Sequence, residues 1–437
     1  MNKRFLAVTA VAATTALVAS ACSSGGDQSS SSSGGGGSAS GGGEAVTLVF
    51  QSLSDQPAAI AATEDIVDQW NADHPDIQVK IQPVGWDGVY DKLITQFNGG
   101  AAPDIIHYEA ASIVSFAQDG YLADLTDLMP SDFANDLPEG LLDTVTVDGQ
   151  VIAYPTEMQT YTVFANKTLL DQAGVEIPTG DTVTWDQIRQ IAKATTKDGV
   201  YGLAWGLKSP TATFMTMGPQ FGGTYFEGSG ADATISIGEG ELALPQLVHD
   251  MADEDGSIMP VTLTQSGSEA LAAWYDGQAA LTVQGSFQAA NIAADAPEGF
   301  DWVVLPPVEG PEGPSVAANP QTLSINIDSP HVEEAAQFLD FFTSADNLAA
   351  LNKADALIPA TLSAQKKLAD ELGTTDGWDK ILASGQYMGS APYLSVDKYA
   401  QWKDTVATPA FQKYLADQTD LTGLQEELTT GWDTLDQ

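Results

Sequence analysis

Arginine is almost missing from this 437-residue sequence, which contains only Arg4 and Arg189. Lys and Arg together number 16, against 59 Asp and Glu, and the formal net charge is −43 at pH 7. Phosphate binding requires clustered basic side chains, so nucleic acid is excluded as a partner. Arg is also the usual bidentate partner of carboxylates and phosphates, so a neutral or cationic ligand is favoured over an anionic one. Solubility or a salty environment is an alternative explanation for the acidity.

Cysteine occurs once, at Cys22, which excludes an intrachain disulfide. Residues 1–21 have the basic start, apolar run and small residues of a secretory signal peptide. The apolar run ends at Val18 and is shorter than the roughly 20 residues of a membrane-spanning helix. The stretch from Val18 to Cys22 resembles a bacterial lipobox, although Ala19 stands where a larger aliphatic residue is commoner. This resemblance implies that Cys22 is acylated and becomes the mature N-terminus.

A tract of Ser and Gly follows at residues 23–43. Such a tract buries no apolar surface, so we expect a flexible tether with an average reach on the order of 25 Å. The remaining residues, 44–437, are too many for one hydrophobic core and enough for two lobes.

Apolar periodicity alternates between strand and helix in the first part of these lobes. Strands are predicted at 46–50, 77–84 and 103–107, with helices at 57–74 and 87–97 between them. This alternation is typical of a parallel α/β sheet. Further strands are predicted at 150–155, 161–166, 201–205, 279–284, 301–305 and 322–327. Further helices are predicted at 184–196, 332–342, 346–353, 362–372 and 421–435.

Several stretches, in this order along the chain, resemble the extracellular solute-binding proteins of bacterial sugar importers, the family that includes maltose-binding protein. The stretches are Trp70 to Val79, Ala102 to Ile106, Phe116 to Leu125, Ile152 to Pro155, Asn166 to Leu170, Thr184 with Trp185, Gly277 to Leu281, Gln284 to Phe287, Leu305 with Pro306, and Ala335 to Phe342. Each is weak alone, but together they are specific and extend from about residue 46 to the end.

The resemblance implies an α/β, periplasmic-binding-protein-like fold, with two α/β lobes joined by hinge strands and a ligand cleft between them. Residues 44–154 and 306–345 would form the first lobe, and residues 155–305 and 346–437 the second. The implied function is capture of a neutral mono- or oligosaccharide and delivery to the membrane permease subunits of an ABC importer. We expect a monomer without cofactor, held by the Cys22 lipid on the outer face of the cytoplasmic membrane.

A sugar presents hydroxyl groups, which need fixed donors and acceptors, and apolar faces, which stack on aromatic rings. The resemblance places sugar contacts at Tyr108 and Glu109, after a strand, and at Gln159, after the first hinge, with Glu157 as an alternative. Phe287 stands where many relatives carry a stacking Trp. Asn319 and Gln321 lie in a loop that can face the cleft. Trp205, Trp86 and Tyr393 are further aromatic candidates, and a position in the core is the alternative for each.

The histidines, at 74, 107, 249 and 331, are scattered without metal-ligand spacing, so no metal site is expected. Other functions stay open. A glycoside hydrolase needs only a suitable carboxylate pair, which 59 acidic residues could supply. The same fold could also bind a peptide, a polyamine or another cationic solute, or serve as a surface adhesin or sensor.

Overall fold

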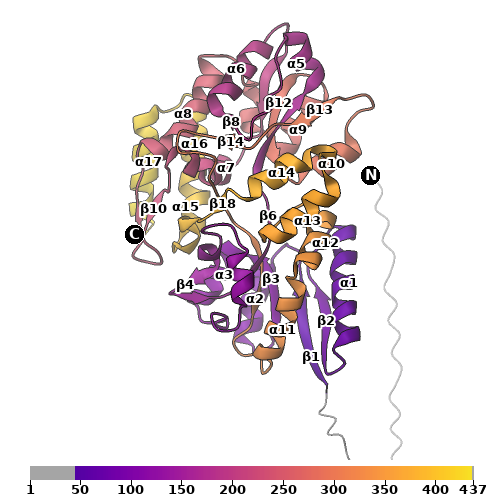
Figure 1. The fold of residues 1–437 in the computed structure, drawn as a ribbon. Helices are drawn as coiled ribbons and strands as arrows, with labels where there is room; N and C mark the ends of the chain where they lie inside the picture. The colour runs from indigo at the N-terminus through magenta and orange to yellow at the C-terminus, as the bar shows by residue number, and fades with distance from the viewer. Residues whose placement is uncertain (1–44, 436–437) are drawn as a thin grey trace, which may run out of the picture. The chain divides into compact units, whose positions relative to one another are not determined.

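A six-stranded sheet and a four-stranded sheet organise the protein in a computed structural model, which describes residues 45–435. The predicted signal peptide, the lipidated cysteine and the whole predicted tether lie outside the described residues. Figure 1 shows the six-stranded sheet in the lower half of the view and the four-stranded sheet in the upper half.

The six-stranded sheet has the order β17-β6-β16-β3-β1-β2. Its strands are β1 (Val46–Ser52), β2 (Ile77–Pro83), β3 (Ile105–Glu109), β6 (Tyr154–Met158), β16 (Gln321–Ile325) and β17 (Ile358–Pro359). The pairs of β1 with β2 and β3 are parallel, as the sequence predicted. The pairs made by β16 and β17 are antiparallel, so the sheet is mixed.

Helix α1 (Pro57–Asp73) covers the parallel half of this sheet with a buried stripe that includes Ile66, Val67 and Trp70. A proline at its first position suits a helix start, since the missing N–H would have no partner there. The Trp70 indole donates to the Ile77 carbonyl oxygen at 2.8 Å, which fixes the helix against the start of β2. Helix α2 (Val89–Asn98) connects β2 to β3.

The four-stranded sheet has the order β13-β7-β12-β9. Its strands are β13 (Trp302–Val304), β7 (Tyr161–Asn166), β12 (Ala279–Gly285) and β9 (Tyr201–Trp205). Helix α6 (Trp185–Thr195) has the predicted capping box at Thr184 and Gln187. Gly202 lets β9 approach this helix closely, because an added Cβ would lie 2.1 Å from the Ala192 carbonyl oxygen.

The chain passes from one sheet to the other between β6 and β7, through Gln159 and Thr160 alone. The sequence predicted one strand at 150–155. The structure instead has the short β5 (Gln150–Val151) and then β6, which continues to the crossing. The register of the pairing between β6 and β16 shifts between Gln321 and Thr322. Pro155, which pairs with Thr322, has no backbone N–H to donate.

The helices after residue 330 divide between the sheets. They are α11 (Val332–Phe342), α12 (Ala345–Asp355), α13 (Leu362–Leu372), α14 (Trp378–Gly385), α15 (Tyr399–Trp402), α16 (Thr408–Leu415) and α17 (Leu421–Thr434). Helix α12 packs against α1, and β17 pairs with β6, although residues 346–437 were assigned to the second lobe. The lobe boundaries remain a prediction, and this pairing favours placing residues 346–359 with the first lobe.

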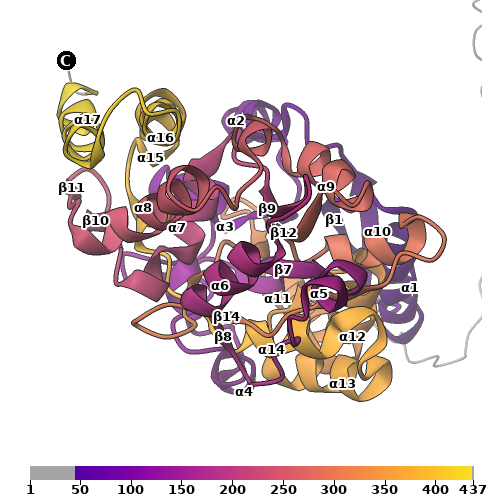
Figure 2. The same ribbon diagram turned by 90° about the horizontal axis from the view of Figure 1, so that it is seen from above.

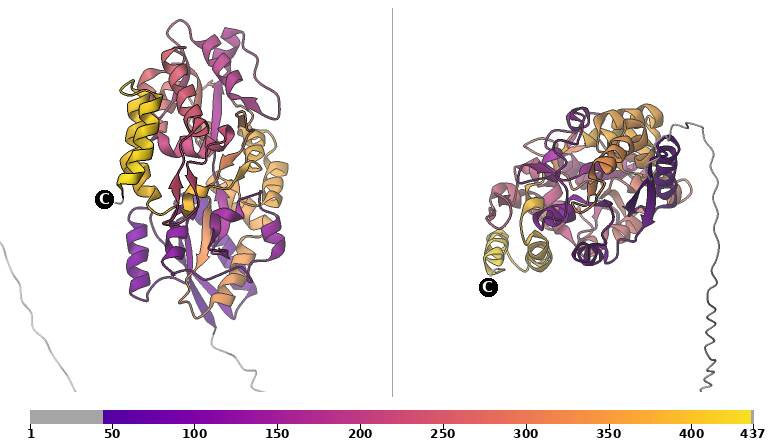
Figure 3. Two further views of the ribbon diagram at one scale, coloured as in Figure 1. Left: turned by 90° about the vertical axis from the view of Figure 1, so that its left-hand side faces the viewer. Right: turned by 90° about the horizontal axis from the view of Figure 1, so that it is seen from below.

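Helices α16 and α17 pack on α7 (Pro210–Met217) and α8 (Glu239–Asp253), on the side opposite α1 in Figure 2 and in the right-hand view of Figure 3. Among the described residues, the structure contains no helix with the length and apolar character needed to cross a membrane.

Candidate functional site

Two adjoining cavities of about 640 and 500 Å³ lie where the two sheets meet. They share Gln159, Phe287, Asn319 and Gln321 in their walls. Gln321 belongs to the six-stranded sheet, Phe287 follows β12 of the four-stranded sheet, and Gln159 lies on the crossing between them. A ligand that occupied both cavities would therefore contact both sheets and the connection that joins them.

Two aromatic rings with substantial exposure line the first cavity. Trp86 and Phe287 are each 37% exposed, whereas most large apolar side chains here are buried. Gly285 makes room for the Phe287 ring, because an added Cβ would lie 2.4 Å from it. The stretch from Gln284 to Phe287 thus has a local physical role, which is to hold an aromatic ring at the cavity wall.

Buried polar atoms without partners also line the first cavity. Within residues 45–435, Glu157 Oε1 has no hydrogen-bond partner, and His107 Nε2 and Gln321 Oε1 have none within hydrogen-bond geometry, although these two side chains interact with each other. A buried polar atom left without a partner costs about 1–3 kcal/mol. These atoms are therefore available to a bound ligand or to water.

The His107 side chain is a neutral donor at this wall. Its Nδ1 accepts from the Leu53 backbone N–H at 3.1 Å, so the ring proton of the neutral form resides on Nε2. Burial lowers the pKa of His107 to about 4, although the neighbouring Gln321 side chain partly opposes the shift. The ring can therefore donate from Nε2 to a ligand oxygen at neutral pH.

Three carboxylates, Asp55, Glu157 and Asp355, line the same cavity. Burial, reinforced by the charge of Asp355, raises the pKa of Glu157 well above its ordinary value. Burial and the charge of Asp55 raise the pKa of Asp355 to about 6. Within the described part of the chain, no group of three His, Cys, Asp or Glu side chains is arranged to hold a metal ion.

The second cavity has a different polar lining, with Glu109, Tyr161, Lys208 and Gln284 in its walls. Asn319 Nδ2 donates to Glu109 Oε2 at 3.2 Å. The Gln284 amide donates to the Gly267 carbonyl oxygen at 3.0 Å and to the Thr282 hydroxyl at 2.9 Å. These contacts fix the side chains whose free oxygen atoms could accept from a ligand.

The structure brings most of the predicted site residues together. Trp86, Gln159, Phe287 and Asn319 line the first cavity, and Glu109 and Trp205 line the second. Glu157, named as an alternative to Gln159, and Gln321, expected in a loop facing the cleft, also lie in the walls. Trp205 is only 1% exposed. The Trp205 ring therefore lies behind the surface of the second cavity and has no open face on which a ligand could stack.

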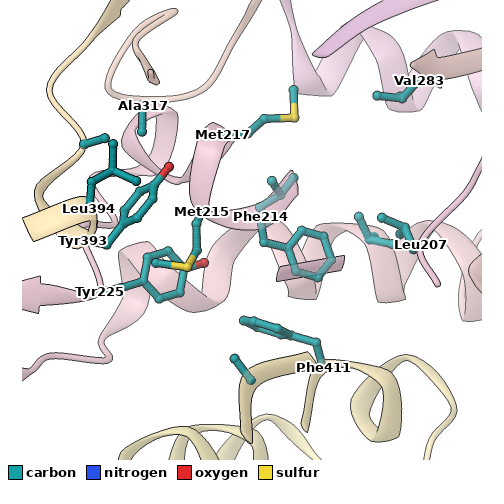
Figure 4. Packing of buried hydrophobic residues seen from close by; sticks show 14 of the residues in the cluster. Leu207, Phe214, Met215, Met217, Tyr225, Val283, Ala317, Tyr393, Leu394 and Phe411 are labelled. Carbon is teal, nitrogen blue, oxygen red and sulfur yellow. The ribbon is translucent and has the colours of Figure 1, made fainter. Parts of the chain in front are cut away.

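Tyr108 and Tyr393 line neither cavity. Tyr108 is buried, with its ring 6.0 Å from that of Trp86 and 6.1 Å from that of Phe116. Tyr393 is also buried, and Figure 4 shows it beside Leu394 in an apolar cluster. In both cases the aromatic ring packs within the protein, which was the stated alternative for Tyr393.

Sequence reasoning missed several wall residues. Asp55 follows β1, and the ends of parallel strands commonly form ligand sites, so its position carried a usable signal. His107 was noted only as a scattered histidine, and its cavity position depends on the β3 register. Asp355 ends α12, and nothing in its local pattern distinguishes it from a solvated helix residue.

The fold and the cavities define a protein with space for a small ligand where its two sheets meet. A model of the family described as bacterial extracellular solute-binding protein matches residues 54–349, and the chain belongs to that family.

Relatives and solved structures agree with this assignment. The uncharacterized lipoprotein in the oleD 5' region of Streptomyces antibioticus is 38% identical over 380 residues, covering 86% of this chain and 84% of the relative. The cyclic alpha-maltosyl-1,6-maltose binding protein of Arthrobacter globiformis has a similar fold, with TM-score 0.76, 19% identity, and coverage of 88% of this chain and 98% of that one. Maltose-bound MalE3 of T. maritima has TM-score 0.69, 22% identity, and coverage of 90% and 100%.

Proposed function

We propose that this protein is the substrate-binding lipoprotein of an ABC importer, and that it captures a mono- or oligosaccharide without negative charge and delivers it to the membrane permease subunits. The observation that carries this proposal is the pair of adjoining cavities that share Gln159, Phe287, Asn319 and Gln321. Their walls combine exposed aromatic rings with polar atoms that lack partners.

This combination fits the chemistry of a sugar. The rings of Trp86 and Phe287 can cover apolar sugar faces, and His107 and Gln321 can exchange hydrogen bonds with hydroxyl groups. The combined volume exceeds that of one sugar ring, which favours a ligand of more than one residue. The names of the similar proteins from Arthrobacter globiformis and T. maritima, which refer to maltose-containing saccharides, support this ligand class.

Capture would proceed by closure of the two lobes. Contacts to both sheets stabilise only the arrangement in which the sheets face one ligand, so binding shifts the population toward it. Gln159 and Thr160 are the direct connection between β6 and β7, and a relative rotation of the sheets would change their backbone dihedral angles. The closed form would then be recognised by the permease.

A thermal-shift screen over mono- and oligosaccharides tests the proposal. A saccharide at 100 times its dissociation constant should add about 2.7 kcal/mol to the free energy of unfolding. Peptides and polyamines in the same screen test the alternative cargoes. Stabilisation by peptides alone, with no response to any saccharide, would overturn the proposal.

The hydrolase alternative needs a separate measurement. Each stabilising saccharide is incubated with the protein and recovered by chromatography. We expect the saccharide to be recovered intact over many hours. Shortened products would instead assign a catalytic role to the carboxylates of the first cavity.

A further inference from the structure

The two cavities differ in charge. Of the described residues that line the first cavity, Asp55, Glu157 and Asp355 are acidic and none is Lys or Arg. The second cavity, by contrast, includes both Glu109 and Lys208. The protein therefore has a distinct acidic end within one continuous ligand site.

Glu157 is the most deeply placed of these acids, with 2% of its surface exposed. It lies on β6, next to Gln321 of β16 in the sheet, and its Oε1 has no hydrogen-bond partner among the described residues. The titratable groups around it are Asp355 at the end of α12, Asp55 after β1, and His107 on β3. None of these supplies a positive charge at neutral pH, since His107 is neutral there.

Aromatic faces lie in the same cavity as the acids. Trp86 and Phe287 expose part of their rings to it. A protonated amine is attracted both to carboxylates and to aromatic faces, whereas a neutral hydroxyl group gains little from the ring quadrupole. An ammonium group also has three donors, which matches a wall of several acceptor oxygens.

We propose that the captured saccharide carries a protonated amine and that this amine binds in the first cavity, against the Glu157 carboxylate. This inference rests on the proposed saccharide function and narrows it to amino sugars with a free amine. Asp55 and Asp355 add negative charge around the amine, and Trp86 and Phe287 cover it. The His107 N–H is left for an oxygen of the same sugar. The amine removes the repulsion among the three acids, which have no other cation in this wall.

Matched sugars separate the amine from the rest of the ligand. The probes are glucosamine, glucose and N-acetylglucosamine, and the corresponding β-1,4-linked dimers to tetramers, each titrated by calorimetry at pH 6.5. We expect the free-amine member of at least one set to bind ten times more tightly than its hydroxyl and acetamide partners. Equal binding of all three members, or preference for a neutral one, overturns the inference and leaves the saccharide function standing. Failure of all saccharides to bind refutes the saccharide function itself.

Two variants and one control test the assignment to Glu157. Glu157→Gln and Asp355→Asn should each lower the amine preference to about threefold or less, with little change in binding of the neutral partner. Glu298→Gln makes the same chemical change at an exposed carboxylate outside both cavities, and should leave the preference unchanged. Melting curves establish that the variants are folded, and Asp355→Asn serves if Glu157→Gln is not. An amine preference that survives both substitutions overturns the placement.

Lower pH and added divalent cations provide two further tests of the inference. Amine binding should weaken as the pH falls through about 6, where Asp355 gains a proton, while binding of the neutral partner should change little over the same range. Stabilisation of the sugar-free protein by millimolar Ca²⁺ or Mg²⁺, abolished by Glu157→Gln, would reassign the acids to a metal and overturn the inference.

Discussion

Asn319 and Glu109 are 210 residues apart in the sequence, and the Asn319 amide donates to the Glu109 carboxylate at 3.2 Å. The other end of the same amide accepts from the Ala111 backbone N–H at 3.1 Å. Asn319, two residues before β16, therefore contacts both the last residue of β3 and the first turn of the following helix, α3 (Ala110–Gln118), and it fixes a carboxylate at the wall of the second cavity.

Asn319→Ala should weaken saccharide binding by about tenfold, since the Glu109 carboxylate loses the group that orients it. The free energy of unfolding should fall by about 1 kcal/mol or less, because the contact is exposed. Calorimetric titration and a denaturation curve measure the two effects. A large loss of stability with unchanged affinity would assign Asn319 a purely structural role.

Phe287→Ala should reduce affinity by about 1–3 kcal/mol through lost stacking and apolar contact. The melting temperature should change little, since the ring is 37% exposed. Phe214→Ala is the contrasting control. Phe214 is fully buried, with its ring 5.1 Å from that of Phe411 (Figure 4), and its removal should cost about 3–5 kcal/mol of stability. Similar destabilisation by both variants would place Phe287 in the core.

Gln159→Ala should reduce affinity by about 1 kcal/mol, because a sugar hydroxyl would lose its partner on closure. Gln401→Ala removes an exposed amide outside both cavities and should leave affinity unchanged. Calorimetric titration of both variants with the saccharide found in the screen measures the two affinities. Equal affinities in the two variants would remove Gln159 from the site.

Asp355→Asn should stabilise the ligand-free protein at high pH. Burial raises the pKa of Asp355 to about 6, so its carboxyl group favours folding when protonated. That contribution is complete below the unfolded-state pKa and is lost as pH rises through about 6. The variant should therefore match the wild type near pH 4 and exceed its stability by about 1 kcal/mol at pH 8. Denaturant titrations at both pH values provide the measurement, and an equal difference at pH 4 and pH 8 would contradict this origin.

Cys22→Ser should release the protein from the membrane or block its maturation, because the predicted lipid is attached there. Ligand affinity should not change, since the predicted tether separates Cys22 from the cleft. Fractionation of cells into membrane and soluble parts tests this, with saccharide titration of the released protein as the control. Membrane attachment that persists in the variant would count against a lipid at this position.

Local sequence patterns predicted most strands of the two large sheets and several helices, but not helices such as α8 and α16. The stripes that gave α1 and α6 are short-range features, and the structure has both helices close to the predicted bounds. The antiparallel pairing of β16 with β3 and β6 has no such signal, because it joins residues from distant parts of the chain. The position of β17 beside β6 was missed for the same reason.

Site residues could be predicted where a side chain suited to a sugar stands at a position that contacts the ligand in the resembled family, as for Gln159 and Phe287. Residue type alone could not distinguish Trp86, which is partly exposed at a cavity, from Tyr393, which is buried. Glu157 was named as an alternative contact, but Asp55 and Asp355 were missed because the proximity of the three acids depends on three elements. Asp55, Glu157 and Asp355 come from the end of β1, from β6 and from α12, and only the completed sheet brings them to one wall.

The place of β16 in the six-stranded sheet also sets an order for folding. During synthesis, all strands of the four-stranded sheet are present once the chain reaches residue 304. In the six-stranded sheet, β3 and β6 both pair with β16, which begins only at Gln321. Until then β3 and β6 have open edges, and pairing between segments so distant in sequence is slow. A nascent chain halted short of Gln321 would also lack β17, so one edge of β3 and both edges of β6 would be unpaired. We expect such fragments to aggregate even though most of the protein had been synthesised.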